Sequence, residues 1–159
     1  MSDLGRLITA MITPFDDKGE IDYEEAGHLA NSLISSGSDG VIISGTTGES
    51  PALSKDEKIR LLSAVKEAVG SRGSVIAGTS NNNTQESIEI SQLAEKAGAD
   101  GLLLTVPYYN KPPQQGLYEH FKIIAESVDV PCMLYNVPSR TSTNMTDETT
   151  TRLSHIENI

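Results

Sequence analysis

Two adjacent hydroxyl side chains stand between glycines in the run Gly45-Thr46-Thr47-Gly48, directly after the apolar stretch Val41–Ile43. Glycine can take backbone conformations closed to other residues and lets a ligand approach the main chain. Threonine hydroxyls both donate and accept hydrogen bonds, so they can hold a carboxylate or pass on a proton. The run therefore predicts a site for a small acid, and the simpler alternative is a glycine-rich turn with polar filler.

Two later loops also carry groups that could do chemistry. Tyr108 and Tyr109 lie among prolines, where a phenol could transfer a proton, or where either ring could simply anchor the loop. Tyr135 ends an apolar stretch, and Arg140 follows it in the next loop. The planar guanidinium of arginine matches a carboxylate, although many loop arginines only face solvent.

Short apolar stretches recur along the chain, and helical patterns separate them. These stretches are continuous rather than alternating, which is typical of strands buried on both faces. The order of strand, helix and strand predicts βαβ units and a parallel sheet. The expected strands are Leu7–Ile12, Gly40–Ser44, Val75–Thr79, Gly101–Val106 and Cys132–Val137.

Helix ends can also be predicted from the sequence. Asp22 with Glu25, and Ser54 with Glu57, have the spacing of an N-cap residue and its reciprocal partner. Thr84 is expected to open a third helix. Glycines that follow the helical patterns are expected to end these helices: Gly37, Gly70 and Gly98.

Polar and glycine-rich residues follow nearly every expected strand. An open doubly wound sheet gathers its ligand at one switch point, whereas a closed barrel uses several βα loops around one mouth. Because polar and glycine-rich loops follow nearly every expected strand, the sequence favours a (β/α)8 TIM barrel, a fold that typically has about 250 residues. We therefore expect residues 1–159 to be the N-terminal part of a single TIM-barrel domain, supplying about the first five βα units.

Composition excludes several classes of partner. The 12 basic and 22 acidic residues give a formal net charge of −10, which argues against nucleic acid and anionic membranes. The single cysteine, Cys132, excludes an internal disulfide, and no apolar run has the length of a membrane span. The N-terminus has no signal-peptide pattern. We expect a cytoplasmic protein that needs neither a metal nor an organic cofactor.

Three runs, in this order and at this spacing, resemble the motifs of a known family: Gly45–Ser50, Pro107–Pro112 and Tyr135–Thr141. They are similar to those of the dihydrodipicolinate synthase family, within the class I pyruvate-dependent aldolases that also include N-acetylneuraminate lyase. The resemblance covers the whole chain. It implies a TIM-barrel lyase in which pyruvate forms a Schiff base with a lysine and condenses with aspartate 4-semialdehyde, on the way to lysine and diaminopimelate.

The resemblance implies a role for each matched residue. Tyr135 would be the general acid and base, and Thr46 would relay protons between Tyr135 and Tyr109. Tyr109 would reach in from a neighbouring subunit of a homo-oligomer, a dimer or a tetramer. Thr47, beside Gly48, would bind the pyruvate carboxylate. We therefore expect Thr46 and Tyr135 to approach within hydrogen-bonding distance at the carboxyl ends of the strands.

Arg140 would bind the carboxylate of the semialdehyde, and it separates this branch from the N-acetylneuraminate lyase branch, which remains an alternative. The Schiff-base lysine would lie on a sixth strand beyond Ile159. Because no lysine in this sequence is expected to end a strand, the chain alone is expected to be inactive. A non-catalytic half-barrel, whether a fragment or a degenerate paralogue, is the alternative of another class.

Four residues match a site that binds lysine as a feedback inhibitor in responsive members of the family: Ser50, Asn82, Glu86 and Tyr108. Lys55 and Lys58 stand where those members carry histidines, and Pro51 replaces a small residue. Two ammonium groups would repel a cationic amino acid. Feedback inhibition by lysine is therefore not expected.

Overall fold

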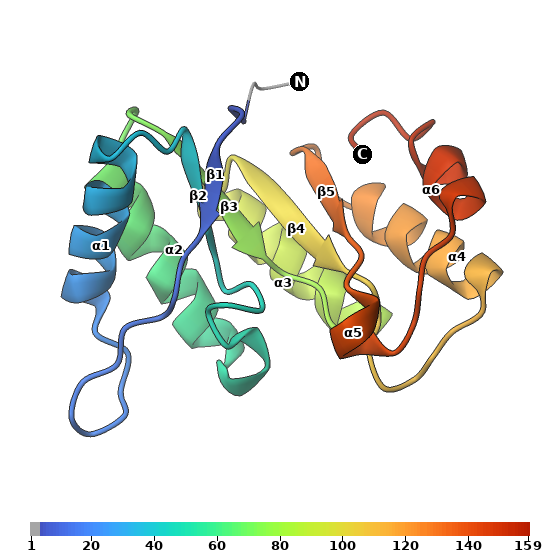
Figure 1. Ribbon diagram of the computed structural model, residues 1–159, viewed down its shortest axis with the longest axis horizontal. Helices are drawn as coiled ribbons and strands as arrows, with labels where there is room; N and C mark the ends of the chain where they lie inside the picture. Colours follow the sequence, from blue (N-terminus) through green and yellow to red (C-terminus); the bar gives the residue numbers. More distant parts are fainter. Residues whose placement is uncertain (1–3) are drawn as a thin grey trace.

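The computed structural model describes residues 4–159, which form a single parallel sheet flanked by helices (Figure 1). Every neighbouring pair of strands is parallel, and the strands lie side by side in chain order. A doubly wound sheet would reverse its order at a switch point, so this order is that of a barrel. The strands are β1 (Ile8–Ala10), β2 (Gly40–Ile43), β3 (Ser74–Gly78), β4 (Gly101–Thr105) and β5 (Cys132–Tyr135).

Helices return the chain between successive strands, as parallel pairing requires. The expected fold class is confirmed: the described residues form five strands of a barrel with their helices. No helix in residues 4–159 is both long and apolar enough to cross a membrane. The helices are α1 (Tyr23–Ser35), η1 (Ser50–Ala52), α2 (Lys55–Val69), α3 (Thr84–Lys96), α4 (Gln114–Ala125), α5 (Pro138–Thr141) and α6 (Asp147–Leu153).

Two of the predicted helix starts are confirmed. The Asp22 carboxylate accepts a hydrogen bond from the backbone N–H of Glu25 at 2.9 Å. Ser54 and Glu57 form a complete capping box, in which each side chain binds the backbone of the other. Such caps satisfy N–H groups that have no partner within the helix and typically contribute about 1 kcal/mol.

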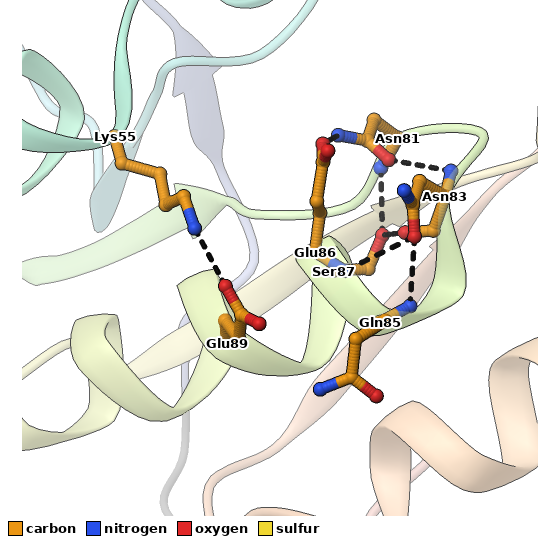
Figure 2. Close-up of polar contacts among 7 residues, drawn as sticks. All are labelled: Lys55, Asn81, Asn83, Gln85, Glu86, Ser87 and Glu89. Carbon is orange, nitrogen blue, oxygen red and sulfur yellow. Dashed lines mark hydrogen bonds and ion pairs between the residues drawn. The ribbon is translucent and has the colours of Figure 1, made fainter.

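The third helix also begins where it was predicted, at Thr84, and Asn83 is its N-cap. The Asn83 side chain accepts from the backbone N–H groups of Gln85 and Glu86, as Figure 2 shows. The Thr84 hydroxyl instead hydrogen-bonds Nδ1 of His120 at 2.8 Å. Burial lowers the pKa of His120 to about 4, so its ring is neutral at pH 7. A tertiary contact has taken the hydroxyl that could have capped the helix.

The sheet has two faces of different character, because successive side chains of a strand point to opposite sides. Val41 and Ile43 of β2 and Leu104 of β4 are buried in the core beneath the helices. Ile76 and Leu103 are also buried but lie outside that core cluster, on the inner face of the sheet.

Two exposed apolar side chains flank β1. Leu7 and Ile12 are 58% and 57% exposed. In the described residues β1 and β5 each have a single paired neighbour, so both present an unpaired edge. Such edges invite pairing with other chains.

A polypeptide of residues 1–159 produced alone is therefore expected to associate rather than remain a monomer. Size-exclusion chromatography with light scattering measures this directly. Ile12→Lys places a charge beside the exposed edge and should shift the population towards monomer. A monodisperse monomer of the unaltered polypeptide would contradict the expectation.

Candidate functional site

A cavity of about 630 Å³ opens at the carboxyl ends of the strands. Its wall includes residues from the loops after β2, β3 and β4 and from α2, α3 and α5. Of the residues singled out in the sequence, those that line it are Thr46, Ser50, Pro51, Lys55, Lys58, Glu86, Tyr108 and Arg140. One cavity thus joins Thr46 and Arg140 to residues of the expected effector site, whereas Tyr135 and Tyr109 are not among the residues that line it.

Three of the expected binding residues lie outside the wall of this cavity. Thr47 is exposed, and Gly48 is buried beneath the loop. Asn82 is half-buried, and its neighbour Asn81 lines the cavity in its place.

The glycines of the first motif can take left-handed conformations, but neither does so here. Positive φ occurs instead at Ser44 (50°) and Glu49 (56°). Space at Gly48 is tight: a Cβ atom there would lie 3.1 Å from Oγ1 of Thr13, whose hydroxyl donates to the Gly48 carbonyl at 2.7 Å. Close packing, rather than a positive φ, therefore favours glycine at this position.

Ser44 has a strained backbone and a buried side chain that lines the cavity. Its Oγ has no hydrogen-bond partner in the part of the chain that is described. Its carbonyl oxygen lies against Gly78, where an added Cβ would come within 2.1 Å of that oxygen. Strain of this kind persists only where the surrounding structure enforces it, and it is common at functional sites.

Tyr135 lies on the inner face of the sheet. Its neighbour Leu134 packs against the core beneath the helices, so Tyr135 points the other way. It is in register with Thr105, which lines the cavity. Residues in register share one face of a sheet. Tyr135 itself is not among the residues that line the cavity.

The expected direct hydrogen bond between Thr46 and Tyr135 is absent among the described residues. Thr46 follows β2, and two strands separate β2 from β5. Neighbouring strands lie about 4.8 Å apart, so three steps amount to about 14 Å along the sheet.

Tyr109 points away from its own chain. Its side chain is 88% exposed and its φ is +69°. The adjacent Asn110 donates from Nδ2 to the Asn82 carbonyl at 2.9 Å, which ties this loop to the loop after β3. A clamped loop thus presents an aromatic side chain to solvent rather than to the cavity of its own chain.

The loop after β3 is itself held by a network of side-chain hydrogen bonds (Figure 2). Asn81 Oδ1 accepts from the Asn83 N–H at 2.6 Å, and Asn81 Nδ2 donates to the Glu86 carboxylate at 2.9 Å. Ser87 Oγ accepts from the Asn81 N–H and donates to the Asn83 carbonyl. The cavity wall formed by this loop is therefore well ordered.

The charged groups at the outer end of the cavity differ in their partners. Lys55 donates to Glu89 at 2.6 Å, which raises the pKa of Lys55 and lowers that of Glu89 (Figure 2). Burial lowers the pKa of Lys58, and the nearby Glu86 carboxylate opposes this shift. Burial, followed by the charge of Glu86, raises the pKa of Tyr108.

Sequence reasoning missed several polar residues of the wall. Ser80 lies just beyond β3, accepts from the Thr105 N–H at 2.6 Å and donates to the Thr105 carbonyl. Ser44, Asn81 and Thr141 also line the cavity. Their place just beyond an apolar stretch was the available signal. Within residues 4–159 there is no group of three or more His, Cys, Asp or Glu side chains that could hold a metal.

Comparison with known proteins places these features in a family context. The profile of a family described as the dihydrodipicolinate synthetase family matches residues 3–159. A 4-hydroxy-tetrahydrodipicolinate synthase from Dehalococcoides mccartyi is 60% identical over 159 residues, which is 100% of this chain and 54% of that protein. The chain spans about half the length of the curated relatives it matches.

Two solved structures extend the similarity to three dimensions. Dihydrodipicolinate synthase from Bacillus anthracis superposes with a TM-score of 0.97 at 49% identity, covering 100% of this chain and 55% of that one. A chloride-inhibited dihydrodipicolinate synthase from Acinetobacter baumannii, in complex with pyruvate, gives a TM-score of 0.95 at 40% identity. That match covers 99% of this chain and 54% of the other.

The contact between Ser44 and Gly78 yields a stability prediction. Gly78→Ala should destabilise the protein by about 1–3 kcal/mol or more, because the new methyl group meets a backbone oxygen that cannot rotate away. Chemical denaturation measures the change. Gly78→Ala with an unaltered free energy of unfolding would show that this loop moves freely.

Proposed function

Because this chain belongs to the dihydrodipicolinate synthetase family, we propose that it forms the N-terminal part of a TIM-barrel lyase. The enzyme condenses pyruvate with L-aspartate 4-semialdehyde to give 4-hydroxy-tetrahydrodipicolinate, in the cytoplasm, for lysine and diaminopimelate biosynthesis. The names of the relatives support this reaction, and the Acinetobacter baumannii structure is a complex with pyruvate. The observation that carries the proposal is that Thr46 and Arg140 line one cavity, on the face of the sheet that bears Tyr135.

In the proposed reaction a lysine amine, supplied from beyond residue 159, adds to the pyruvate carbonyl and loses water to form an imine. Loss of a methyl proton gives an enamine, whose carbon attacks the aldehyde of the second substrate. Tyr135 moves protons at these steps, which is a role that a positioned phenol can fill. Thr47 and Gly48 bind the pyruvate carboxylate, and Arg140 binds that of the semialdehyde.

The proposed proton relay includes a tyrosine from a second copy of the chain. Tyr109 lies exposed on a clamped loop and does not line the cavity of its own chain. We propose that Tyr109 enters the cavity of a neighbouring subunit and completes a relay through Thr46 in a homo-oligomer, a dimer or a tetramer. A tyrosine presented to solvent with strained backbone is the observation that supports this contact.

The proposed reaction is tested by supplying both substrates to the protein that also carries the Schiff-base lysine. The expected result is formation of the cyclic product, and reduction with borohydride in the presence of pyruvate should leave a covalent adduct. Absence of both the product and the adduct would reject the proposal.

In that protein, Tyr135→Phe should lower kcat by roughly 10²–10⁴-fold with little loss of stability, because it removes one hydroxyl from the proton path. Tyr118→Phe is the matched control, since Tyr118 packs against Arg152 on the helical side. Turnover near that of the unaltered enzyme would remove Tyr135 from the mechanism.

Arg140→Ala should raise KM for the semialdehyde by roughly ten- to hundredfold, the loss expected for a charge-assisted hydrogen bond. Capture of pyruvate, followed by borohydride trapping, should change little. Arg6→Ala, at the exposed amino end of the sheet, is the control. Equal losses for both substrates would assign Arg140 a structural role.

A further inference from the structure

The side chain of Asn158 binds the connection between α4 and β5. Its Nδ2 atom lies 2.9 Å from the carbonyl oxygen of Ala125, 3.0 Å from that of Val128 and 3.3 Å from that of Val130. An amide nitrogen carries two hydrogens, so the three carbonyls share two donors. The last carbonyls of a helix have no partner within it, and Ala125 is the last residue of α4. Asn158 therefore holds this connection through its carbonyl groups.

A second residue holds the N–H groups of the same connection. The carboxylate of Glu95, in the last turn of α3, accepts from the Asp129 N–H at 2.7 Å and from the Val130 N–H at 3.2 Å. Hydrogen bonds to an ionised group are stronger than those between neutral groups. The connection to which Asn158 is bound is thus itself fixed to α3.

The backbone of Asn158 meets the edge of β5 that faces away from β4. Cys132, the first residue of β5, donates from its N–H to the Asn158 carbonyl at 2.7 Å. Leu102 of β4 donates in the same way to the carbonyl of Pro131 at 2.8 Å, and Pro131 directly precedes β5. In that pair Leu102 is in register with Cys132. The same pattern at Asn158 places Ile159 in register with Cys132.

A strand that runs on from Ile159 in this register passes Tyr135. From Cys132 to Tyr135, the last residue of β5, is about 10 Å along the strand at about 3.3 Å per residue. The side chains of such a strand depend on this register, because a slip of one residue turns each of them to the other face. Asn158 is bound on both sides of the point where the register begins, by its side chain and by its carbonyl.

We propose that Asn158 is a positioning residue, which sets the register against β5 of the strand that carries the Schiff-base lysine. The lysine amine thereby meets Tyr135. This inference rests on the proposed function, in which that lysine comes from beyond residue 159. An amide suits the position because its donors face carbonyl groups, whereas a carboxylate would present only acceptors to them.

The test uses the protein that also carries the Schiff-base lysine. Asn158→Leu is close to asparagine in size and removes the donors. Both kcat and the maximal rate of adduct formation with pyruvate, measured by borohydride trapping, should fall about ten- to hundredfold, because a misplacement of about 1 Å can cost that much. The pyruvate concentration for half-maximal trapping should stay the same, because Thr47 and Gly48 follow β2 and not β5. Asn158→Ser keeps one donor and should show a smaller fall in both rates.

Gln92→Leu is the matched control. Gln92 Nε2 donates to the carbonyl of Ser127 at 3.3 Å, so it binds the same connection from α3 and not from the edge of β5. This variant should lose stability in chemical denaturation while its kcat and trapping rate stay those of the unaltered protein. A purely structural role of Asn158 would give its variants the same behaviour.

The outcomes separate this inference from the proposed function. Lower stability with unchanged kcat and trapping rate in the Asn158 variants would overturn the positioning role, and Asn158→Ser decides this if Asn158→Leu does not fold. A raised half-saturating pyruvate concentration at an unchanged maximal rate would also overturn it, because the effect would then lie on binding. If the unaltered protein forms no adduct with pyruvate, the proposed function fails, and this inference fails with it.

Discussion

Parallel pairing of each strand with the next strand in the chain is the constraint on which the rest of this structure depends. A parallel connection cannot be a tight turn, so a helix must return the chain each time. All the βα loops therefore leave the sheet at the carboxyl ends of the strands. Residues as distant in sequence as Thr46 and Arg140 thereby come to line one cavity. The chemistry of the site follows from topology before it follows from any single side chain.

Residues with unusual backbone conformations also lie in the loops at the carboxyl ends of the strands. Ser44, Glu49 and Tyr109 all have positive φ in loops that follow strands. Each such residue costs about 1–3 kcal/mol, which must be offset elsewhere. The apolar core beneath the helices supplies that stabilisation, with Leu62, Leu104 and Phe121 fully buried. The face of the sheet beneath the helices is thus well packed, whereas the loops at the carboxyl ends of the strands are polar and contain strained residues.

Features that depend on local sequence could be predicted, and features that depend on tertiary contacts could not. The capping box of Ser54 and Glu57 forms because both partners lie within one turn. The helix start at Thr84 could be predicted, but the hydrogen bond of the Thr84 hydroxyl to His120, far along the chain, could not. The tight packing around Gly48 likewise depends on a distant residue, Thr13. Neither partner is visible from the local pattern.

The net charge of the chain follows from its composition, whereas the charge of the cavity depends on which residues the fold brings together. A net charge of −10 disfavours polyanionic partners, because their contacts extend over a large acidic surface. Exposed charges are screened within about 8 Å at physiological ionic strength, so the surface exerts little effect inside a cavity. The charged residues that line the cavity are three cations and one carboxylate: Lys55, Lys58, Arg140 and Glu86. An acidic protein can therefore exclude nucleic acids and still attract the small carboxylates on which its proposed chemistry depends.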